Sequence, residues 1–296
     1  MRTELDSAFL PNSRTAPSGQ LWLPAAAGAM LLAGGWVLTS WLSLDPLWAA
    51  TLRVLPAGLL LLAIKPARPD MVWCQRSVAL GIVNFGAFFT LQALAVRHVS
   101  PGVAATIAAT QTLFVPFGAR SLLQQTVRPH HVVLAVVGLT GIAMLLLPNG
   151  TTLDVVGGCA SVGTAACTAI GLVLTTYWGR PAGVHHMSST GWQMTAGGLI
   201  LLPCALLTRE LPTLDWHAVS IVATTSILGT AIAFSSIFGA LHAGLPASVV
   251  SRLMLLCPVA VSLTDLLLRR QDPSALRLVG FGLVLISVAA TTIRVR

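Results

Sequence analysis

Long apolar runs, separated by short breaks at Pro, Gly or charged residues, dominate this sequence from residue 21 onward. A helix that crosses a bilayer needs roughly 20 consecutive apolar residues, whereas strands of a membrane barrel would alternate with period two. The runs are continuous and do not alternate. The sequence therefore predicts an all-α integral membrane protein with ten transmembrane helices over the ranges 21–42, 46–64, 76–96, 101–123, 130–148, 154–178, 187–207, 216–241, 246–268 and 274–292.

Composition excludes the main soluble classes. Only 9% of the residues are charged, against about 25% in a typical globular domain. The net charge of +8 could suggest a nucleic-acid partner. However, the basic residues are scattered beside apolar runs, as cytoplasmic membrane flanks are. We therefore expect the chain to lie in a lipid bilayer and to bind no nucleic acid.

Three helix starts carry the chemistry of a capped N-terminus. Asp45-Pro46, Ser100-Pro101 and Asp272-Pro273 each supply an oxygen acceptor followed by a proline, and the missing N–H of proline costs nothing at the first helical position. Because the connections are short, consecutive helices must run antiparallel.

The distribution of Lys and Arg predicts the orientation in the membrane. With the N-terminus inside, ten basic residues fall on the inner side and five on the outer side, as the positive-inside rule requires. We expect a multi-pass protein of the cell (inner) membrane with both termini cytoplasmic and residues 1–20 as a cytoplasmic tail.

The chain also resembles itself. The pair Ala93-Leu94 recurs 147 residues later as Ala240-Leu241, and Thr51–Leu62 superposes on Gly191–Leu202 with a shift of 140. We therefore expect two repeats of five helices, residues 21–148 and 149–296. An odd number of crossings inverts the second repeat, which is typical of secondary transporters with a site between their halves.

This layout, together with Arg53 in the second span, the Ala-Leu pair and Pro258 in the ninth span, resembles the EamA-type branch of the drug/metabolite transporter superfamily. Within it the chain looks most like the YddG-type exporters of aromatic amino acids. Two features depart from the family pattern: Gln111 stands where proline is common, and Gln124-Gln125 and Arg270-Gln271 stand where an acidic residue is common. The resemblance implies a single-chain carrier of small metabolites without a cofactor.

Two polar faces inside the spans are the main candidates for a substrate site. Asn84, Phe88 and Gln92 recur at every fourth position of the third span, and Thr230, Phe234 and Phe238 do so in the eighth, so each triplet shares one helix face. Such groups can equally join helices to one another. The other candidates for substrate binding are Trp36, Ser40, Thr106, Thr110, Gln111, Thr164, Thr168, Trp192, Gln193 and Ser251; their hydroxyls can also bond their own helix.

Three charged residues lie within spans, where exposure to lipid would cost about 2.5 to 3.5 kcal/mol. Arg252 could bind a substrate carboxylate through two parallel hydrogen bonds, or form a structural pair. We expect a structural or gating role for Arg53. Asp265 lies four residues before Arg269, which favours a local ion pair.

Enzyme motifs are missing from the sequence. Neither H-E-x-x-H nor G-x-S-x-G occurs, so neither a zinc protease nor a serine hydrolase is expected. The five cysteines lie in or beside apolar runs without metal-ligand spacing and are interpreted as small hydrophobic residues. We expect no catalytic residues, no metal and no obligatory protein partner.

The sequence thus predicts a membrane transporter that exports small organic metabolites, with aromatic or large neutral amino acids as expected substrates. Export is expected to run downhill by alternating access, because the first span and the third to fifth spans contain no Asp or Glu to couple protons. The alternatives are a proton-coupled exporter and, from another class, a membrane-embedded enzyme or accessory protein.

Overall fold

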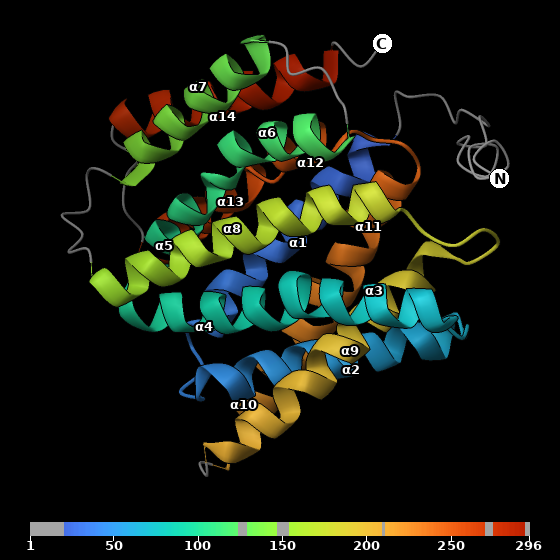
Figure 1. Ribbon diagram of the computed structural model, residues 1–296. Coiled ribbons are helices and arrows are strands. Elements are labelled where there is room, and N and C mark those ends of the chain that lie inside the picture. Colours follow the sequence, from blue (N-terminus) through green and yellow to red (C-terminus); the bar gives the residue numbers. More distant parts are fainter. Residues whose placement is uncertain (1–20, 124–128, 147–153, 209–210, 270–274, 294–296) are drawn as a thin grey trace, which may run out of the picture.

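The computed structural model describes residues 21–123, 129–146, 154–208, 211–269 and 275–293 (Figure 1). All regular structure in these segments is helical, and the expected tail 1–20 and the expected cap Asp272 lie outside them. The helices are α1 (Trp22–Thr39), α2 (Pro46–Ile64), α3 (Met71–Gly81), η2 (Ile82–Ala87), α4 (Phe88–His98), α5 (Pro101–Ala109), α6 (Gln111–Leu123), α7 (Pro129–Leu146), α8 (Val155–Trp178), α9 (His186–Leu207), α10 (Trp216–Ser226), η4 (Ile227–Ile232), α11 (Ala233–His242), α12 (Ala247–Leu253), α13 (Leu256–Arg269) and α14 (Ala275–Ile293).

Eight helical stretches in the described part of the chain are long and apolar enough to cross a membrane. Each corresponds to an expected span. The expected ranges 130–148 and 274–292 coincide with α7 and α14, whose apolar parts are the shorter helices Val132–Met144 and Leu278–Val288. The chain is therefore a multi-pass, all-helical membrane protein, and the crossing of the membrane by α7 and α14 stays a prediction.

The predicted caps are confirmed at both described positions. The Asp45 carboxylate accepts a hydrogen bond of 2.9 Å from the backbone N–H of Leu47, and the Ser100 hydroxyl accepts one of 3.5 Å from that of Val103. Each precedes a proline at the start of its helix. These caps satisfy backbone donors that a helix start leaves free.

Four expected spans are not the continuous α-helices that the sequence suggested. The third and eighth contain π-helical segments, η2 and η4, which begin 145 residues apart. The fourth span breaks at Thr110, between α5 and α6, and the ninth breaks at Met254-Leu255, between α12 and α13. Pro258 contributes to the second break, because it lacks an N–H for the carbonyl of Met254 four residues earlier.

The two repeats contact each other most extensively through α2 and α9 and through α7 and α14; the second pair lies side by side in Figure 1. Glycines allow α2 and α9 to approach closely. A Cβ on Gly58 would lie 2.6 Å from the backbone nitrogen of Thr195, and one on Gly198 would lie 2.7 Å from the Cβ of Leu55. The shift of 140 residues exchanges these two contacts.

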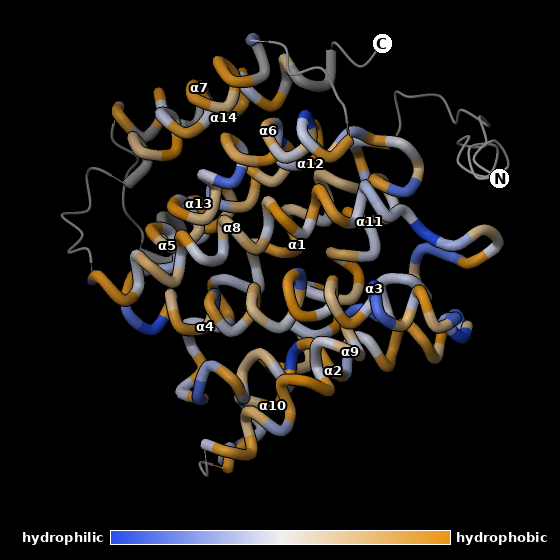
Figure 2. Tube along the Cα trace, in the orientation of Figure 1, coloured by the Kyte–Doolittle hydropathy of each residue, from blue (hydrophilic) through white to orange (hydrophobic). Residues whose placement is uncertain are grey.

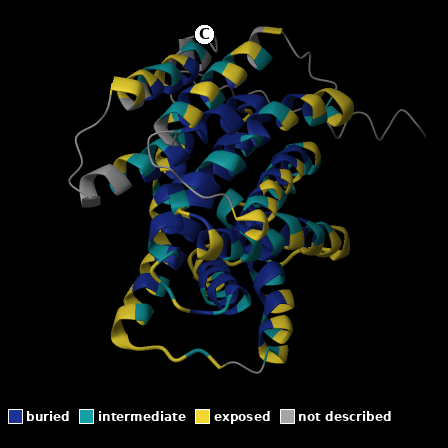
Figure 3. Cartoon of the chain, turned by 90° about the vertical axis from the view of Figure 1, so that its left-hand side faces the viewer, coloured by how far each residue is buried: buried dark blue, intermediate teal, exposed yellow. Residues whose placement is uncertain are grey.

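Burial and hydropathy are arranged as in a protein surrounded by lipid. Apolar residues run along the whole length of the helices (Figure 2), and the buried residues lie in the middle of the bundle (Figure 3). Large apolar side chains also face outward: Leu59, Ile170 and Leu199 are 53%, 51% and 55% exposed. An outer surface with so many large apolar side chains is favourable in contact with lipid hydrocarbon and unfavourable in contact with water.

Candidate functional site

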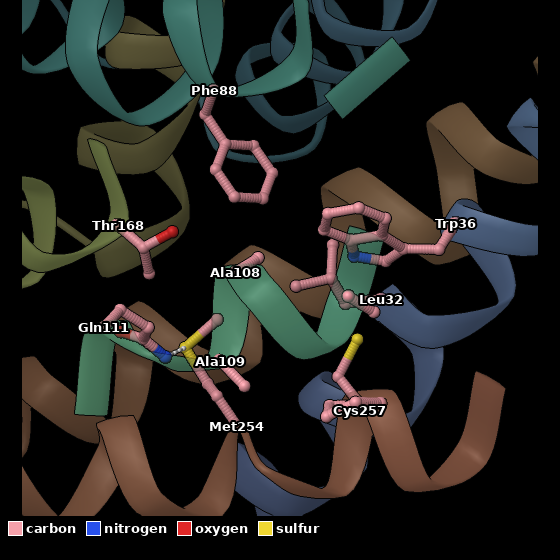
Figure 4. A pocket seen from close by; sticks show the side chains of 11 residues that line it. Leu32, Trp36, Phe88, Ala108, Ala109, Gln111, Thr168, Met254 and Cys257 are labelled. Carbon is pink, nitrogen blue, oxygen red and sulfur yellow. Dashed lines mark hydrogen bonds between the residues drawn. The ribbon is translucent and has the colours of Figure 1, made fainter. Parts of the chain in front are cut away.

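A cavity lies where the two broken spans meet (Figure 4). Trp36 of α1 and Phe88 of α4 contribute aromatic rings to it, and Gln111, the first residue of α6, contributes an amide. The cavity is lined by Leu32, Trp36, Phe88, Ala105, Ala108, Ala109, Gln111, Thr168, Met254, Cys257 and Pro258. The wall is therefore mostly apolar, with neutral hydrogen-bonding groups.

A second, smaller cavity adjoins the first. Phe88, Thr168 and Met254 line both, and the second cavity is completed by Asn84, Leu172, Phe234, Ile237 and Phe238. The phenylalanine rings pack edge to face, with centroids 5.9 Å apart for Phe88–Phe234 and 5.5 Å for Phe234–Phe238. This geometry is favourable for aromatic pairs.

The space that water molecules could occupy is about 30 Å³ in the larger cavity and about 10 Å³ in the smaller one. A single water needs about 10 to 15 Å³ measured in this way. Both cavities thus have room for only one or two waters, and a larger molecule would fit only after the surrounding helices move apart.

Seven residues predicted from the sequence come together around these two cavities, although they belong to five separate spans. The seven are Trp36, Asn84, Phe88, Gln111, Thr168, Phe234 and Phe238.

Other predicted residues line neither cavity, and most have local partners. The hydroxyls of Ser40, Thr106, Thr110, Thr164 and Ser251 donate to carbonyls three or four residues earlier in their own helices, which satisfies them without a ligand. The indole N–H of Trp192 donates to the carbonyl of Ala67 at 2.9 Å and ties α9 to the connection before α3.

Sequence reasoning missed Met254 and Cys257. Both are apolar in character and lack a periodic polar partner, so no pattern singled them out. Pro258, noted as a feature of the ninth span, was the available signal, because its helix break exposes this wall. The Cys257 thiol is buried there.

The Arg53 cluster occupies the space between α1, α2, α4 and η4. Arg53 is 3% exposed, and its Nε donates to the Thr230 hydroxyl at 2.7 Å. Its other donors reach the Gln92 side-chain oxygen and the Thr39 hydroxyl, both at 3.2 Å, and the carbonyls of Gly35 and Gly229 at 3.4 and 3.1 Å. The guanidinium also lies 4.3 Å from the centre of the Phe89 ring, a favourable cation–π distance.

The Asn84 cluster joins η2, α8 and α9. The Asn84 amide donates to the Thr175 hydroxyl at 3.1 Å and to the Gln193 side-chain oxygen at 3.2 Å. Gly171 makes room for it, since a Cβ there would lie 1.7 Å from the Asn84 side-chain oxygen. Gln92, Thr230 and Gln193 thus belong to clusters beside the cavities and do not line them.

Arg252, on α12, is 3% exposed, and among the described residues its Nε and Nη1 have no hydrogen-bond partner. It lines neither cavity, although Met254, two residues later, lines both. The Asp265 side chain lies outside the described residues, so its expected pair with Arg269 stays a prediction.

One ion pair joins the end of α4 to the start of α8. His98 and Asp154 approach to 3.4 Å, and both are partly exposed. The backbone N–H of Gly157 lowers the pKa of Asp154, and His98 contributes a smaller attraction. Within the described part of the chain, no group of three or more His, Cys, Asp or Glu could hold a metal ion.

Comparison with known proteins gives consistent results. Residues 18–147 and 156–293 each match the EamA-like transporter family. Protein PecM of Dickeya dadantii is 37% identical over 248 residues, which cover 82% of each chain. A chloroplastic WAT1-related protein of Arabidopsis thaliana is 26% identical over 260 residues, which cover 82% of this chain and 62% of that one.

A solved crystal structure supports the fold. It superposes with a TM-score of 0.75 at 20% identity and covers 92% of this chain and 96% of its own. The double match and the similarity to PecM extend over most of the sequence. The chain therefore belongs to the EamA-like transporter family.

Proposed function

We propose that this protein exports small organic metabolites, with aromatic or large neutral amino acids as its substrates. The observation that carries the proposal is the central cavity, whose wall combines Trp36 and Phe88 with the neutral groups of Gln111 and Thr168. Aromatic walls with a few placed polar groups are typical of sites for small molecules. Membership in a transporter family supports movement of the bound molecule across the membrane over its chemical conversion.

We propose alternating access between two inverted repeats as the mechanism. Support comes from features that recur in both repeats: a π-helical segment in the third helix of each and a break in the fourth. The reciprocal contacts of Gly58 and Gly198 across α2 and α9 add to this. In this proposal both termini are cytoplasmic, and the cavity is reached from one side of the cell membrane at a time.

Arg252 is the proposed partner of the substrate carboxylate. Leaving a buried guanidinium donor unpaired is costly, and a carboxylate would satisfy Nε and a terminal nitrogen together. Because Arg252 lies just before the break at Met254, movement of α12 against α13 would bring it to the cavity.

Transport by the purified chain in liposomes tests the function. Radiolabelled Phe or Trp should equilibrate across the membrane without an imposed ion gradient. Transport that requires a pH gradient would favour a proton-coupled exporter, and absence of transport would refute the proposal.

Replacement of Arg252 tests the carboxylate contact. Arg252→Ala should weaken the apparent affinity for Trp about tenfold or more, while the affinity for tryptophanamide, which lacks the carboxylate, should change little. Ser251→Ala, at a hydroxyl that already bonds the carbonyl of Ser248, serves as the control. Equal losses for Trp and its amide would exclude Arg252 from the site.

A further inference from the structure

Gln111 lines the larger cavity and carries an amide acceptor that is buried without a partner among the described residues. Gln111 is 3% exposed, and its Nε2 approaches the Met254 sulfur at 3.8 Å (Figure 4). A thioether sulfur only accepts hydrogen bonds, so the nitrogen of the amide must face Met254. The oxygen, Oε1, is the other end of the amide, and it is buried without a partner among the described residues.

This acceptor is held in place from both sides. Gln111 begins α6 directly after the break at Thr110, so its backbone is fixed by the helix that follows. Its side chain is fixed by Met254, which borders the break in the ninth span. The contact therefore joins the two helix breaks, one from each repeat, and fixes the nitrogen of the amide on Met254.

The rest of the wall decides what kind of donor fits. Trp36 and Phe88 provide rings, and Leu32, Cys257 and three alanines provide apolar surface. The residues that line this cavity include no charged side chain, so an ammonium group would lie there without a counter-ion. A flat neutral ring with an N–H or O–H on its edge satisfies both the apolar wall and the free oxygen.

We infer that Gln111 Oε1 accepts a hydrogen bond from the ring of the substrate and thereby selects rings that carry a donor, such as indole and phenol, over rings without one. This inference rests on the proposed function and specifies its substrate class. The ring enters when the two broken spans move apart, because the cavity as it stands has room for only one or two waters. Selection follows because a ring without a donor would leave Oε1 buried and unpaired.

Two small rings of equal shape test the inference directly. Indole carries an N–H where benzofuran carries an oxygen. Binding of each radiolabelled ring to the full-length protein in nanodiscs is measured by equilibrium dialysis, and the signal from empty nanodiscs is subtracted. Indole should bind about two- to tenfold more tightly than benzofuran, the effect of one neutral hydrogen bond.

Two variants test whether Gln111 causes the preference for indole over benzofuran. Gln111→Leu should abolish it, mainly by weakening the binding of indole, whereas Thr106→Ala, at a hydroxyl that bonds its own helix, should retain it. Equal binding of the two rings by the unmodified protein overturns the inference, and so does a preference that survives Gln111→Leu. The liposome assay distinguishes failure of this inference from failure of the proposed function. Transport of Trp without a preference between the two rings would leave the proposed function intact, whereas absence of any transport would refute that function itself.

Discussion

The Arg53 and Asn84 clusters occupy equivalent places in the two repeats but differ in strength. A separation of 136 residues relates Gly35 and Thr39 in one to Gly171 and Thr175 in the other, and 140 residues relate Arg53 to Gln193. In both clusters a glycine makes room for a polar side chain and a threonine hydroxyl accepts from it. A π-helix contributes to both: η4 supplies the acceptor Thr230 to the first cluster, and η2 supplies Asn84, the central donor, to the second.

The central donor makes the difference. A cation with five hydrogen bonds and an aromatic contact holds the first cluster, whereas a neutral amide with two hydrogen bonds holds the second. Hydrogen bonds from charged donors are about twice as strong as neutral ones. The same fold therefore holds equivalent positions of its two repeats with hydrogen bonds of unequal number and strength.

The two clusters lie toward opposite ends of the bundle. Thr39 is the last residue of α1, next to the connection before α2, and Thr175 lies near the end of α8. In the proposed topology the Arg53 cluster is on the outer side and the Asn84 cluster on the inner side. We therefore expect the resting protein to open more readily toward the cytoplasm.

The largest expected effect comes from removing Arg53, and the comparison is its counterpart in the second repeat, Gln193. Arg53→Ala should lower the midpoint temperature of unfolding in detergent by about 10 °C, because it leaves several buried acceptors unpaired, at about 3 kcal/mol in total. Gln193→Ala removes one acceptor and should lower it by about 3 °C. Differential scanning fluorimetry measures both, and equal shifts would contradict the unequal strength of the clusters.

A methyl group added to the glycines should weaken each cluster without removing its polar residues. A Cβ at position 35 would lie 2.1 Å from an Arg53 nitrogen, so Gly35→Ala must displace the guanidinium. Gly34 has nothing within 4 Å, which makes Gly34→Ala the matched control. Such overpacking typically costs about 1 to 3 kcal/mol.

The same pair of variants exists in the second repeat. Gly171→Ala must displace Asn84, whereas Gly158→Ala in the same helix meets open space. Both test variants should unfold at lower temperature than their controls, and Gly35→Ala should show the larger loss. If Gly34→Ala is as harmful as Gly35→Ala, contact with Arg53 would not explain the effect, because alanine favours a helix more than glycine does.

Access of water to the cavity should reveal which end opens. A cysteine in place of Phe234, which lines the smaller cavity, is treated with a membrane-impermeant thiol reagent from either side, in a protein whose five native cysteines are replaced. Such reagents attack thiolates that contact water. Labelling from the cytoplasmic side should be about tenfold faster, which corresponds to an imbalance of about 1.4 kcal/mol between the two ends.

Weakening the outer cluster should remove this bias. In an Arg53→Gln background the two labelling rates should approach each other. Ile232→Cys is the control, because Ile232 is 43% exposed on the outside of the bundle and should label slowly from both sides. A cytoplasmic bias that Arg53→Gln leaves unchanged would show that the clusters do not control opening.

The sequence predicted much of this fold for a simple reason: spans and caps depend on local composition. The sequence alone was enough to identify the apolar runs, the caps at Asp45 and Ser100, and the 140-residue shift between the repeats. Sequence also identified Arg53 as a buried charge that needs partners. It could not supply them, because Thr230 lies 177 residues away.

The π-helical segments in the third and eighth spans could not be predicted from the sequence. Thr230 donates to the carbonyl of Thr225, five residues earlier, and also accepts from Arg53; this arrangement exists only once distant helices are packed. For the same reason hydroxyls such as those of Thr164 and Ser251 could not be separated from true cavity residues such as Thr168. The periodicity of a helix gives its faces, but it does not tell which neighbour each face meets.

The smallest expected effect concerns the ion pair outside both clusters. His98 ends α4, which contributes Gln92 to the Arg53 cluster, and Asp154 caps α8, which contributes Thr175 to the Asn84 cluster. Because folding lowers the pKa of Asp154 below its ordinary 3.8, its stabilising effect is present above that pH and is lost as the pH falls through the folded value. Asp154→Asn should therefore lower the unfolding temperature slightly at pH 6, and the difference from the unmodified protein should shrink as the pH falls below 3.8. Since both residues are partly exposed, the loss should stay well below that of Gln193→Ala. A loss as large as that of Arg53→Ala would mean that this surface pair contributes as much to stability as the buried cluster does.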